Sequence, residues 1–298
     1  MDPPSTEDTT MDGKVVVITG ANIGIGKETA VGLASLGAAV VLACRNHAKS
    51  AVAQSEIVER SGNADVQLVE LDLGDLDSVT AAADEILERW DRLDVLVNNA
   101  GGISTERRTT KQGFEQTFGV NHLGHFLLTS RLLPRLKASA PSRIVNVSSV
   151  GHHAAYRGMG FDDLQSEKRY STMDAYGRSK LANLLFTRGL AARLDGSGVT
   201  ANAVHPGPVR SGFGMDGDMG GLLGLGNRLI RPFEISAAAG AKTSIFLAAA
   251  PEVAKRSGLY WVRCRPGHMS KMARSDEQVA QLWEASEALV AGAGFAVA

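Results

Sequence analysis

The stretch TGANIGIGKETA at residues 19–30 follows an apolar run directly and opens a segment with helical spacing. Its glycines, Gly20, Gly24 and Gly26, fall at the turn between the two. Glycine lets the backbone approach a pyrophosphate without a Cβ atom in the way, and the helix that follows directs free N–H groups toward it. Because this turn lies near the chain start, between a strand and a helix, it predicts a dinucleotide-binding site.

Short runs rich in valine and isoleucine alternate with helical segments along the chain. Nearly continuous apolarity is typical of strands buried on both faces of a parallel sheet. Seven such runs separated by helices predict an α/β fold: a single-domain Rossmann fold with a doubly wound, seven-stranded parallel sheet and helices on both faces. The runs are KVVVIT (14–19), AAVVLAC (38–44), VQLVELD (66–72), LDVLVNN (93–99), RIVNVSS (143–149), VTANAVH (199–205) and GLYWVRC (258–264).

The composition excludes several classes of protein. The 298 residues are 44% hydrophobic and 21% charged with a net charge of −1, so no basic excess indicates binding to nucleic acid or to an acidic membrane face. No apolar run reaches the ~18 residues of a membrane-spanning helix. Cys44 and Cys264 are too few and too far apart for a disulfide framework, and we expect buried thiols. A cytoplasmic location is the prediction.

Two segments differ from the regular alternation. Residues 1–13 are polar and lack the features of a secretory signal, so we expect a disordered leader before one domain at 14–298, with no membrane anchor. Residues 212–226, GFGMDGDMGGLLGLG, are rich in glycine and methionine. They predict a mobile substrate lid around 211–235, and the alternative is a tolerated surface insertion.

The end of the second apolar run indicates which dinucleotide is bound. A cofactor without a 2′-phosphate usually meets an acidic residue there, which accepts a hydrogen bond from the ribose. Cys44 supplies no carboxylate, and the Arg45 guanidinium suits a phosphate. The sequence therefore predicts NADP(H) over NAD(H), and the alternative is that Arg45 is only a solvated charge. Asp72 and the NNAG of residues 98–101 follow the third and fourth runs, where such sheets bind ligands.

Motifs further along the chain resemble a known family. TGANIGIG, NNAG, Asn121 in VNHLGH, NVSS at 146–149, YGRSK at 176–180 and HPGPV occur in the order and approximate spacing of the classical short-chain dehydrogenases/reductases. The resemblance covers about residues 14–265. The wording of GKVVVITGAN, GVNHLGHFLLT, RIVNVSSV, DLQSEKRYS and SKLANLLFTR is most similar to the retinol dehydrogenase group and its bacterial relatives.

Tyr176 and Lys180 lie four residues apart, on one face of an expected helix. The resemblance implies that Tyr176 gives a proton to a carbonyl oxygen or takes one from an alcohol. A free phenol with a pKa of about 10 is a poor base at neutral pH, and we expect the Lys180 ammonium to lower that pKa by favouring phenolate. For this pair alone, ordinary packing beside a solvated lysine is the alternative.

The resemblance implies three further roles. Lys180 also bonds the nicotinamide ribose. Ser149 hydrogen-bonds the substrate oxygen, while Ser148 faces the other way because strand side chains alternate. Asn121 holds a water that connects Lys180 to solvent, and the alternative is an asparagine that satisfies backbone groups inside a helix. The predicted catalytic residues are Asn121, Ser149, Tyr176 and Lys180.

The sixth run is followed by Pro206 and Gly207, which give a fixed turn. By resemblance, the backbone at Val209 holds the nicotinamide carboxamide, and Ser211 stands where a threonine is common. The predicted cofactor-binding residues are Gly20, Asn22, Ile23, Gly24, Ile25, Gly26, Arg45, Asp72, Leu73, Asn99, Ala100, Gly101, Tyr176, Lys180, Pro206, Gly207, Val209 and Ser211.

Four histidines lie close to these residues in the sequence. His122 and His125 have a spacing closer to structural than to ligand use, and His152 and His153 fall in a loop that follows Ser149. No carboxylate cluster joins them, so no metal site is predicted.

The expected function is that of an NADP(H)-dependent oxidoreductase acting on a small apolar aldehyde, ketone or secondary alcohol. Relatives that act on membrane retinoids often have an N-terminal anchor, which makes retinol a poor expectation here. The alternatives are a non-catalytic NADP(H)-binding regulator, or the same chemistry on a steroid, a sugar or an acyl thioester. Family members are often dimers or tetramers, and the apolar residues of LLFTRGLAARL (184–194) favour a homo-dimer or homo-tetramer.

Overall fold

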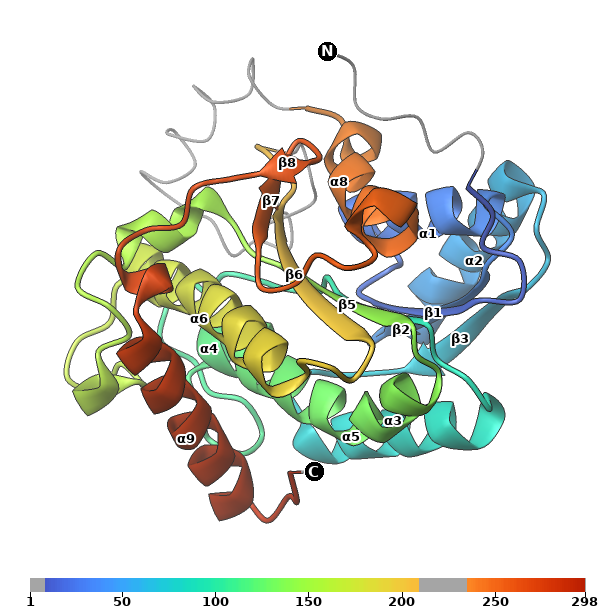
Figure 1. The fold of residues 1–298 in the computed structure, drawn as a ribbon. Helices are drawn as coiled ribbons and strands as arrows, with labels where there is room; N and C mark the ends of the chain where they lie inside the picture. The colour runs from blue at the N-terminus through green and yellow to red at the C-terminus, as the bar shows by residue number, and fades with distance from the viewer. Residues whose placement is uncertain (1–8, 209–234, 298) are drawn as a thin grey trace.

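A computed structural model describes residues 9–208 and 235–297. Within these ranges, strands form one sheet in the order β3-β2-β1-β4-β5-β6-β7-β8, which crosses the middle of the molecule (Figure 1). The chain runs outward from β1 to β3 and returns to β4 on the other side of β1, a reversal that marks where such sheets bind ligands. The strands are β1 (Val15–Thr19), β2 (Ala39–Cys44), β3 (Val66–Glu70), β4 (Val95–Asn98), β5 (Ser142–Val147), β6 (Val199–His205), β7 (Tyr260–Val262) and β8 (Arg265–Pro266).

Strands β1 to β7 pair in parallel, as the seven apolar runs predict. The predicted strand count needs one correction, because β8 pairs antiparallel with β7 at the sheet edge. Arg263 and Cys264 join the two strands, and their φ angles are 51° and 58°. A type I′ hairpin turn requires positive φ at both central residues and usually contains glycine, asparagine or aspartate. Neither residue belongs to those types, so the sequence carries no signal for this turn.

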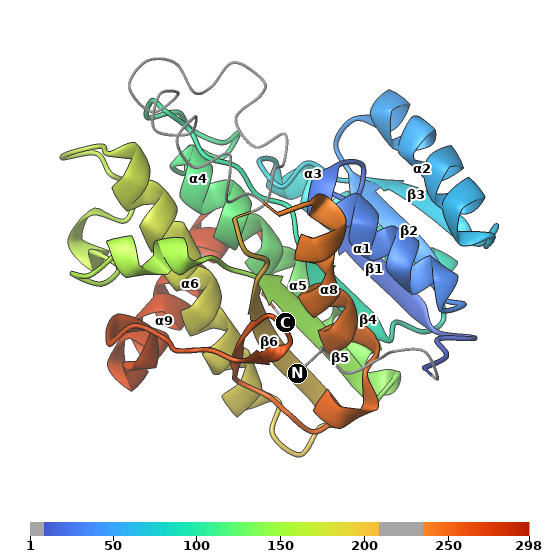
Figure 2. The ribbon, with the colours of Figure 1, turned by 90° about the horizontal axis from the view of Figure 1, so that it is seen from above.

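Helices cover both faces of the sheet (Figure 2). α1, α2 and α8 cover one face, α3, α5 and α6 cover the other, and α9 packs on the outside of α6. The helices are α1 (Gly24–Ser35), α2 (His47–Ser61), α3 (Leu76–Arg89), α4 (Gln116–Phe118), α5 (Gly124–Ala138), α6 (Thr172–Arg193), α8 (Ala237–Ala249) and α9 (Asp276–Gly292). Shorter helical turns are η1 (Gly119–Leu123), η2 (Val150–Ala154), η3 (Phe161–Asp163), η5 (Pro251–Val253) and η6 (Met272–Arg274).

Strand β1 shows why the apolar runs are continuous. Val15 and Val17 belong to the core beneath α3, α5 and α6, whereas Val16 and Ile18 belong to the core beneath α1 and α8. Because successive side chains point to opposite faces, a strand covered on both sides needs apolar residues throughout.

The C-terminal helix α9 covers the outer side of α6. The Trp283 ring lies against Phe126 and Phe186, with centroid distances of 5.3 and 5.9 Å, and the Arg193 guanidinium lies 3.7 Å from the Trp283 ring. The large apolar side chains of residues 184–194, which are Leu184, Leu185, Phe186, Leu190 and Leu194, are buried within the chain. The expectation of a homo-oligomer can therefore no longer rest on these side chains.

The packed chain begins before the predicted domain boundary at residue 14. Met11 is buried, and its N–H donates to a carbonyl at the end of α1. Residues 1–8 of the predicted leader lie outside the described residues. The same holds for the predicted lid at 211–235, of which only Ile235 is described.

Whether the described residues hold membrane-spanning helices, metal sites or disulfides bears on function. Within residues 9–208 and 235–297, no helix is long and apolar enough to cross a membrane. The same ranges contain no group of three or more His, Cys, Asp or Glu side chains that could hold a metal ion. Cys44 and Cys264 are free buried thiols, as expected.

Candidate active site

Those predicted site residues that the structure describes lie at or near the carboxyl ends of the strands. Thr19 ends β1, residues 99–102 follow β4, and Ser149 follows β5. β1 and β4 are neighbours at the point where the strand order reverses. α6 brings the predicted tyrosine and lysine to the end of β5. The fold therefore joins residues that are far apart in the sequence into one candidate site.

The glycine turn between β1 and α1 has no room for side chains. Gly20 has a φ of 64°, and a Cβ there would lie 2.9 Å from the Ala100 Cβ. A Cβ on Gly26 would clash with the Gly20 carbonyl oxygen and lie 2.5 Å from Asn99 Nδ2. Ile23 precedes α1 and offers no side-chain acceptor, so the first N–H groups of the helix remain available to an anion. The turn therefore fits the pyrophosphate of a dinucleotide.

The loop at residues 99–102 is held from two sides. Thr19 Oγ1 accepts hydrogen bonds from the N–H groups of Asn99 and Ala100, each at 2.9 Å. The Asn99 side chain donates to the Thr19 carbonyl oxygen at 2.8 Å. The Asn121 side chain binds the far end of the loop. The predicted cofactor residues in this loop are thus fixed to the glycine turn.

Tyr176 and Lys180 on α6 lie against the end of β5. The Tyr176 hydroxyl forms a hydrogen bond with the Ser149 side chain. The buried Lys180 Nζ donates to the Val147 carbonyl oxygen at 3.2 Å and lies 5.7 Å from the centroid of the Tyr176 ring. A Cβ on Gly101 would lie 3.4 Å from that Nζ, so the ammonium also borders the 99–102 loop. The structure brings the predicted serine, tyrosine and lysine together.

Two glycines allow α6 to approach the segment after Ser149. A Cβ on Gly177 would lie 2.9 Å from the Ala154 Cβ, and a Cβ on Gly151 would lie 2.8 Å from the Tyr176 ring. Both distances are too short for real Cβ atoms, so the phenol packs on bare backbone. Glycine at these positions is therefore a condition for the contact between serine and tyrosine.

Ser148 and Ser149 have different partners. Ser148 Oγ is buried and donates to the Lys180 carbonyl oxygen at 2.8 Å. Ser149 Oγ accepts the Gly151 N–H at 3.0 Å, which leaves its own O–H proton for another acceptor. The choice of Ser149 as the residue that faces the substrate stays a prediction.

Burial governs the protonation of the tyrosine and lysine. Desolvation raises the pKa of Tyr176 above its ordinary value, and the hydrogen bond with Ser149 opposes this change. Desolvation also lowers the pKa of Lys180 to about 8, because burial disfavours the charged ammonium. Burial thus outweighs any lowering of the Tyr176 pKa by Lys180, and the expected lowering stays a prediction. The ammonium is directed at the Val147 carbonyl, and Tyr176 remains a protonated phenol at neutral pH.

Asn121 lies fully buried in η1, a π-helical turn before α5. Its Oδ1 accepts the Gly102 N–H at 2.8 Å, and its Nδ2 donates to the Gly102 carbonyl oxygen at 2.9 Å and to Ser179 Oγ at 3.0 Å. The side chain thus satisfies backbone groups, although in a neighbouring loop rather than in its own helix. The role of holding a water stays a prediction.

Most of the remaining predicted cofactor residues are described, and these lie along the same edge of the sheet. Arg45 follows β2 and is exposed. Asp72 follows β3, where its Oδ1 accepts the Gly74 N–H at 2.8 Å, and Leu73 is buried in the core. Gly207 follows β6 with a φ of 95°. Asn22, Ile25 and Gly24 lie in the glycine turn or at the start of α1, and Pro206 precedes Gly207. Val209 and Ser211 lie outside the described residues.

Two buried histidines hold the main chain of predicted catalytic residues, a role that the sequence analysis does not assign. His125 Nδ1 bonds the Asn121 carbonyl oxygen at 3.2 Å, and its Nε2 bonds Thr19 Oγ1 at 2.8 Å. His152 Nδ1 bonds the Ser149 carbonyl oxygen at 2.6 Å, and its Nε2 accepts a backbone N–H from the segment before η6. The available signal is spacing, because each histidine follows its partner by three or four residues within a helical turn.

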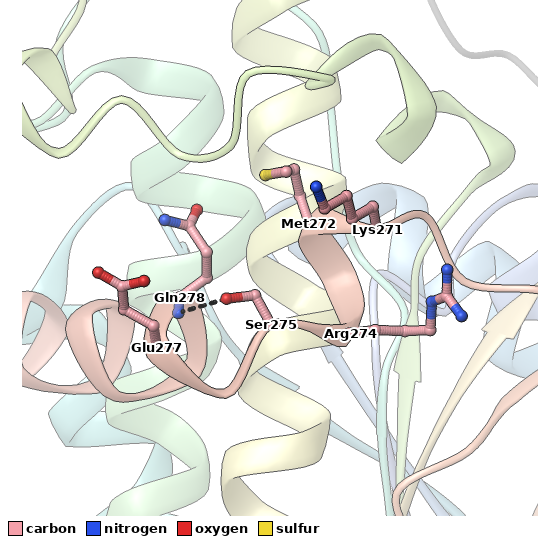
Figure 3. A pocket seen from close by; sticks show the side chains of 6 residues that line it. All are labelled: Lys271, Met272, Arg274, Ser275, Glu277 and Gln278. Carbon is pink, nitrogen blue, oxygen red and sulfur yellow. Dashed lines mark hydrogen bonds between the residues drawn. The ribbon is translucent and has the colours of Figure 1, made fainter.

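A shallow hollow of about 490 Å³ opens at the start of α9 (Figure 3). Ser275 caps the helix there and accepts a hydrogen bond from the Gln278 N–H. The hollow shares no residue with the predicted site, so it belongs to the docking region of α9. Its lining residues are Lys271, Met272, Arg274, Ser275, Glu277 and Gln278.

Comparison with known proteins agrees with this geometry. The family described as short chain dehydrogenase matches residues 14–161. Retinol dehydrogenase 12 from Homo sapiens is 51% identical over 276 residues, which cover 93% of this chain and 86% of that protein. A solved structure of an uncharacterised protein from Mycobacterium paratuberculosis has a TM-score of 0.78 and 35% identity, with 97% and 98% of the two chains covered. The Pseudomonas aeruginosa RhlG/NADP active-site complex has a TM-score of 0.68 and 26% identity, with 85% and 95% covered.

The chain belongs to the short-chain dehydrogenase/reductase family, whose members are oxidoreductases that bind nicotinamide cofactors. Within that family it belongs to the retinol dehydrogenase group.

Proposed function

We propose that the protein transfers a hydride between NADP(H) and the carbonyl or alcohol carbon of an apolar aldehyde, ketone or secondary alcohol. The observation that carries this proposal is the contact between Tyr176 and Ser149 next to the buried Lys180, beside a glycine turn with an uncapped helix end. A nicotinamide cofactor bound at that turn supplies the hydride. The proton and the orientation come from the chain.

Tyr176 is the proposed proton donor. Reduction of a carbonyl requires one proton at the oxygen as the carbon is reduced, and a side chain positioned to give it acts as a general acid. Burial raises the pKa of Tyr176, so the phenol carries its proton at neutral pH. This protonation state favours the reductive direction at neutral pH. Oxidation of an alcohol needs the deprotonated phenol and gains from a higher pH.

Ser149 and Lys180 are proposed to orient the reacting groups. Ser149 Oγ already accepts the Gly151 N–H, so its O–H can donate to the substrate oxygen, where negative charge develops. Lys180 has three N–H donors and uses one on the Val147 carbonyl oxygen. The other two are proposed for the ribose hydroxyls of the cofactor, beside the 99–102 loop.

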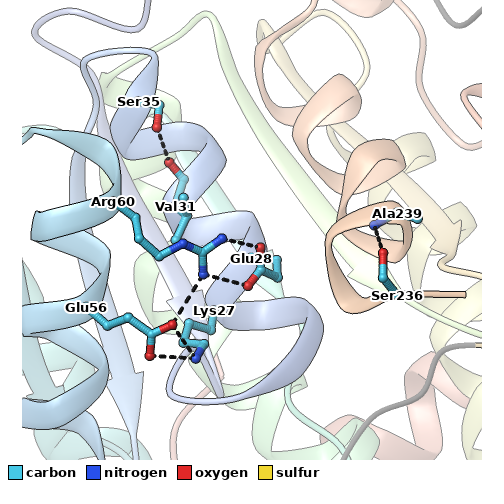
Figure 4. Close-up of polar contacts among 8 residues, drawn as sticks. All are labelled: Lys27, Glu28, Val31, Ser35, Glu56, Arg60, Ser236 and Ala239. Carbon is cyan, nitrogen blue, oxygen red and sulfur yellow. Dashed lines mark hydrogen bonds and ion pairs between the residues drawn. The ribbon is translucent and has the colours of Figure 1, made fainter.

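The preference for NADP(H) is proposed from the end of β2. Cys44 Sγ accepts the Ala21 N–H at 3.1 Å, in the place where a carboxylate would bind the ribose of NAD(H). Arg45 is exposed, and no described residue forms an ion pair with it. Lys27 is a poor candidate for the phosphate because its Nζ bonds both Glu56 oxygens, at 2.8 and 2.9 Å (Figure 4).

The cofactor proposal is tested by kcat/KM with NADPH and with NADH. We expect the wild type to prefer NADPH, and Arg45→Ala to lose about tenfold with NADPH alone, the scale of one charge-assisted contact. Arg60→Ala is the matched control, because Arg60 is a basic residue that bonds Glu28 on α1 (Figure 4). A wild-type preference for NADH contradicts the proposal.

The substrate class is tested by NADPH consumption with a panel of aldehydes, ketones and retinal, extended to a steroid, a sugar and an acyl thioester. We expect turnover to rise with the apolar size of the carbonyl compound. Turnover restricted to one of the other three classes replaces the proposed substrate. Tight NADPH binding without turnover on any compound supports the non-catalytic regulator instead.

A cytoplasmic homo-dimer or homo-tetramer remains part of the proposal. Because the large apolar side chains of residues 184–194 are buried within the chain, subunits would have to meet through the outer side of α9 or through another surface. Sedimentation equilibrium tests this, and a monomer at micromolar concentration contradicts it. Cell fractionation tests the location.

A further inference from the structure

We infer that His125 is a positioning residue that joins the two anchors of the 99–102 loop and so sets the place of that loop against Lys180. The inference rests on the proposed function, because it gives the loop a role in cofactor binding. His125 touches neither the proposed substrate nor the catalytic side chains, and it acts through Thr19 and Asn121.

The first anchor is Thr19, at the end of β1. Its Oγ1 accepts the N–H groups of Asn99 and Ala100, both at 2.9 Å. A hydroxyl oxygen has two acceptor sites, and both are then used. The Thr19 hydroxyl proton must therefore be donated elsewhere.

The direction of that donation determines the tautomer of His125. Two acceptors lie near Thr19 Oγ1: His125 Nε2 at 2.8 Å and the Val97 carbonyl oxygen at 3.5 Å. The shorter contact is the better hydrogen bond. His125 Nε2 is then an acceptor, and the ring proton is on Nδ1, which donates to the Asn121 carbonyl oxygen at 3.2 Å. The imidazole is neutral, because burial lowers its pKa to about 4.

The second anchor is Asn121, in the π-helical turn η1. Its side chain bonds both backbone groups of Gly102, at 2.8 and 2.9 Å. His125 therefore connects the residue that binds the start of the loop with the residue that binds its end. Thr19, Asn121 and His125 are all at most 2% exposed, so water does not compete for these bonds.

Lys180 is the group whose surroundings depend on this connection. A Cβ on Gly101 would lie 3.4 Å from Lys180 Nζ and 3.1 Å from Asn121 Oδ1, so the middle of the loop faces both groups. A shift of the loop changes the space between it and the ammonium. Small displacements of reacting groups cost up to ~10²-fold in rate, so the effect is measurable.

The test uses three substitutions of His125. Leucine removes both hydrogen bonds. Glutamine can keep an acceptor for Thr19, and asparagine can keep a donor for the Asn121 carbonyl. We expect His125→Leu to raise the Kd for NADPH about tenfold and to lower kcat about tenfold, with partial recovery in the glutamine and asparagine variants.

His122→Gln is the matched control, because His122 lies in η1 three residues before His125, is similarly buried and bonds Ser286 Oγ of α9 at 2.8 Å instead of the loop. It is expected to lower Tm while keeping the Kd and kcat within about twofold of wild type.

The Kd is measured by fluorescence of NADPH, which needs no substrate, and the folded fraction by circular dichroism. If His125→Leu is folded and binds NADPH as the wild type does, the inference is overturned, whatever its Tm. If it does not fold, Thr19→Val and Thr19→Ser decide the matter. Valine removes the hydroxyl that links His125 to the loop, serine keeps it, and equal NADPH affinity in both overturns the inference. A wild type that binds NADPH but reduces no carbonyl contradicts the proposed function and leaves this test intact.

Discussion

At the turn between β1 and α1 the chain presents bare backbone and free N–H groups, whereas at the junction of β5 and α6 it presents buried side chains. The first region depends on the absence of side chains, since a Cβ on Gly20 or Gly26 would strike the neighbouring loop. The second depends on Tyr176 and Lys180, whose burial shifts their pKa values away from the charged forms. Substitutions in the two regions should therefore have different effects. Those at the glycine turn should change cofactor affinity, and those at Tyr176 or Lys180 should change turnover.

The largest expected effect is that of Tyr176→Phe, which removes only the phenolic O–H. Loss of a general acid lowers kcat by about 10³-fold. The Kd for NADPH stays at its wild-type value, because the ring and its packing on Gly151 are kept. Stopped-flow turnover and NADPH fluorescence measure the two quantities. Tyr156→Phe is the control, because Tyr156 is 70% exposed. If Tyr176→Phe lost NADPH affinity and turnover to the same extent, the proposed difference between the two regions would be contradicted.

Lys180→Met is expected to lower kcat by about 10²-fold and to stabilise the fold. The lowering of the Lys180 pKa to about 8 corresponds to a cost of about 3 kcal/mol for the buried ammonium. The Val147 carbonyl keeps a partner in the substituted protein, because Asn183 Nδ2 donates to it at 3.0 Å.

The stabilisation by Lys180→Met has a defined pH window. The cost is fully present below pH 8, where folded and unfolded chains both carry the charge. It declines as the pH rises from 8 toward the ordinary lysine pKa of 10.5, and it is lost above that pH, where both are neutral. Urea unfolding at pH 7 and at pH 10 measures the difference. A variant that is less stable than the wild type at pH 7 contradicts the account of Lys180 as a destabilising side chain.

Gly26→Ala tests the glycine turn between β1 and α1, which presents only backbone to the cofactor. The added methyl group must displace the Gly20 carbonyl or the Asn99 side chain, and overpacking of this kind costs about 1–3 kcal/mol. We expect the Kd for NADPH to rise at least tenfold, in the order of ~10-fold per 1.4 kcal/mol, while kcat at saturating NADPH changes little. Gly292→Ala is the control, because nothing lies within 4 Å of a Cβ there. Unchanged NADPH affinity in Gly26→Ala would show that the turn accommodates a methyl group, and would contradict its dependence on bare backbone.

The smallest expected effect is a pH dependence. Lys180 loses its charge as the pH rises through about 8, whereas the raised pKa of Tyr176 keeps the phenol protonated beyond that point. We expect kcat/KM for carbonyl reduction to fall about threefold across this range, since the lost charge weakens the hold on the cofactor. Lys180→Arg, which keeps its charge, should lack this descending limb. If kcat/KM of the arginine variant falls by the same factor as the pH rises, the pH dependence arises from a group other than Lys180.

Local patterns predicted most of the fold. The seven parallel strands lie where the apolar runs are, because burial on both sheet faces leaves a signal within each strand. The strand β8 left no such signal, since Arg263 and Cys264 adopt positive φ without being glycine or asparagine. The conformation of Arg263 and Cys264 depends on the pairing of β8 with β7, and no short stretch of sequence encodes that pairing.

The candidate site was predictable in its residue types and less so in its electrostatics. The spacing of Tyr176 and Lys180 places them on one helix, but their pKa values depend on the covering of α6 and on the carbonyl that Lys180 contacts. The sequence does not reveal the partner of His125, because Thr19 lies 106 residues earlier in the chain. Hydrogen bonds over such separations exist only once the sheet has brought strand ends together.

The position of α9 has a consequence for folding during synthesis. Phe126 and Phe186 lie in helices that leave the ribosome long before Trp283, which later covers them. Until α9 emerges, a nascent chain with its sheet already assembled exposes this aromatic surface on α5 and α6. Chains truncated before residue 276 should therefore aggregate or be degraded, whereas chains that include α9 accumulate.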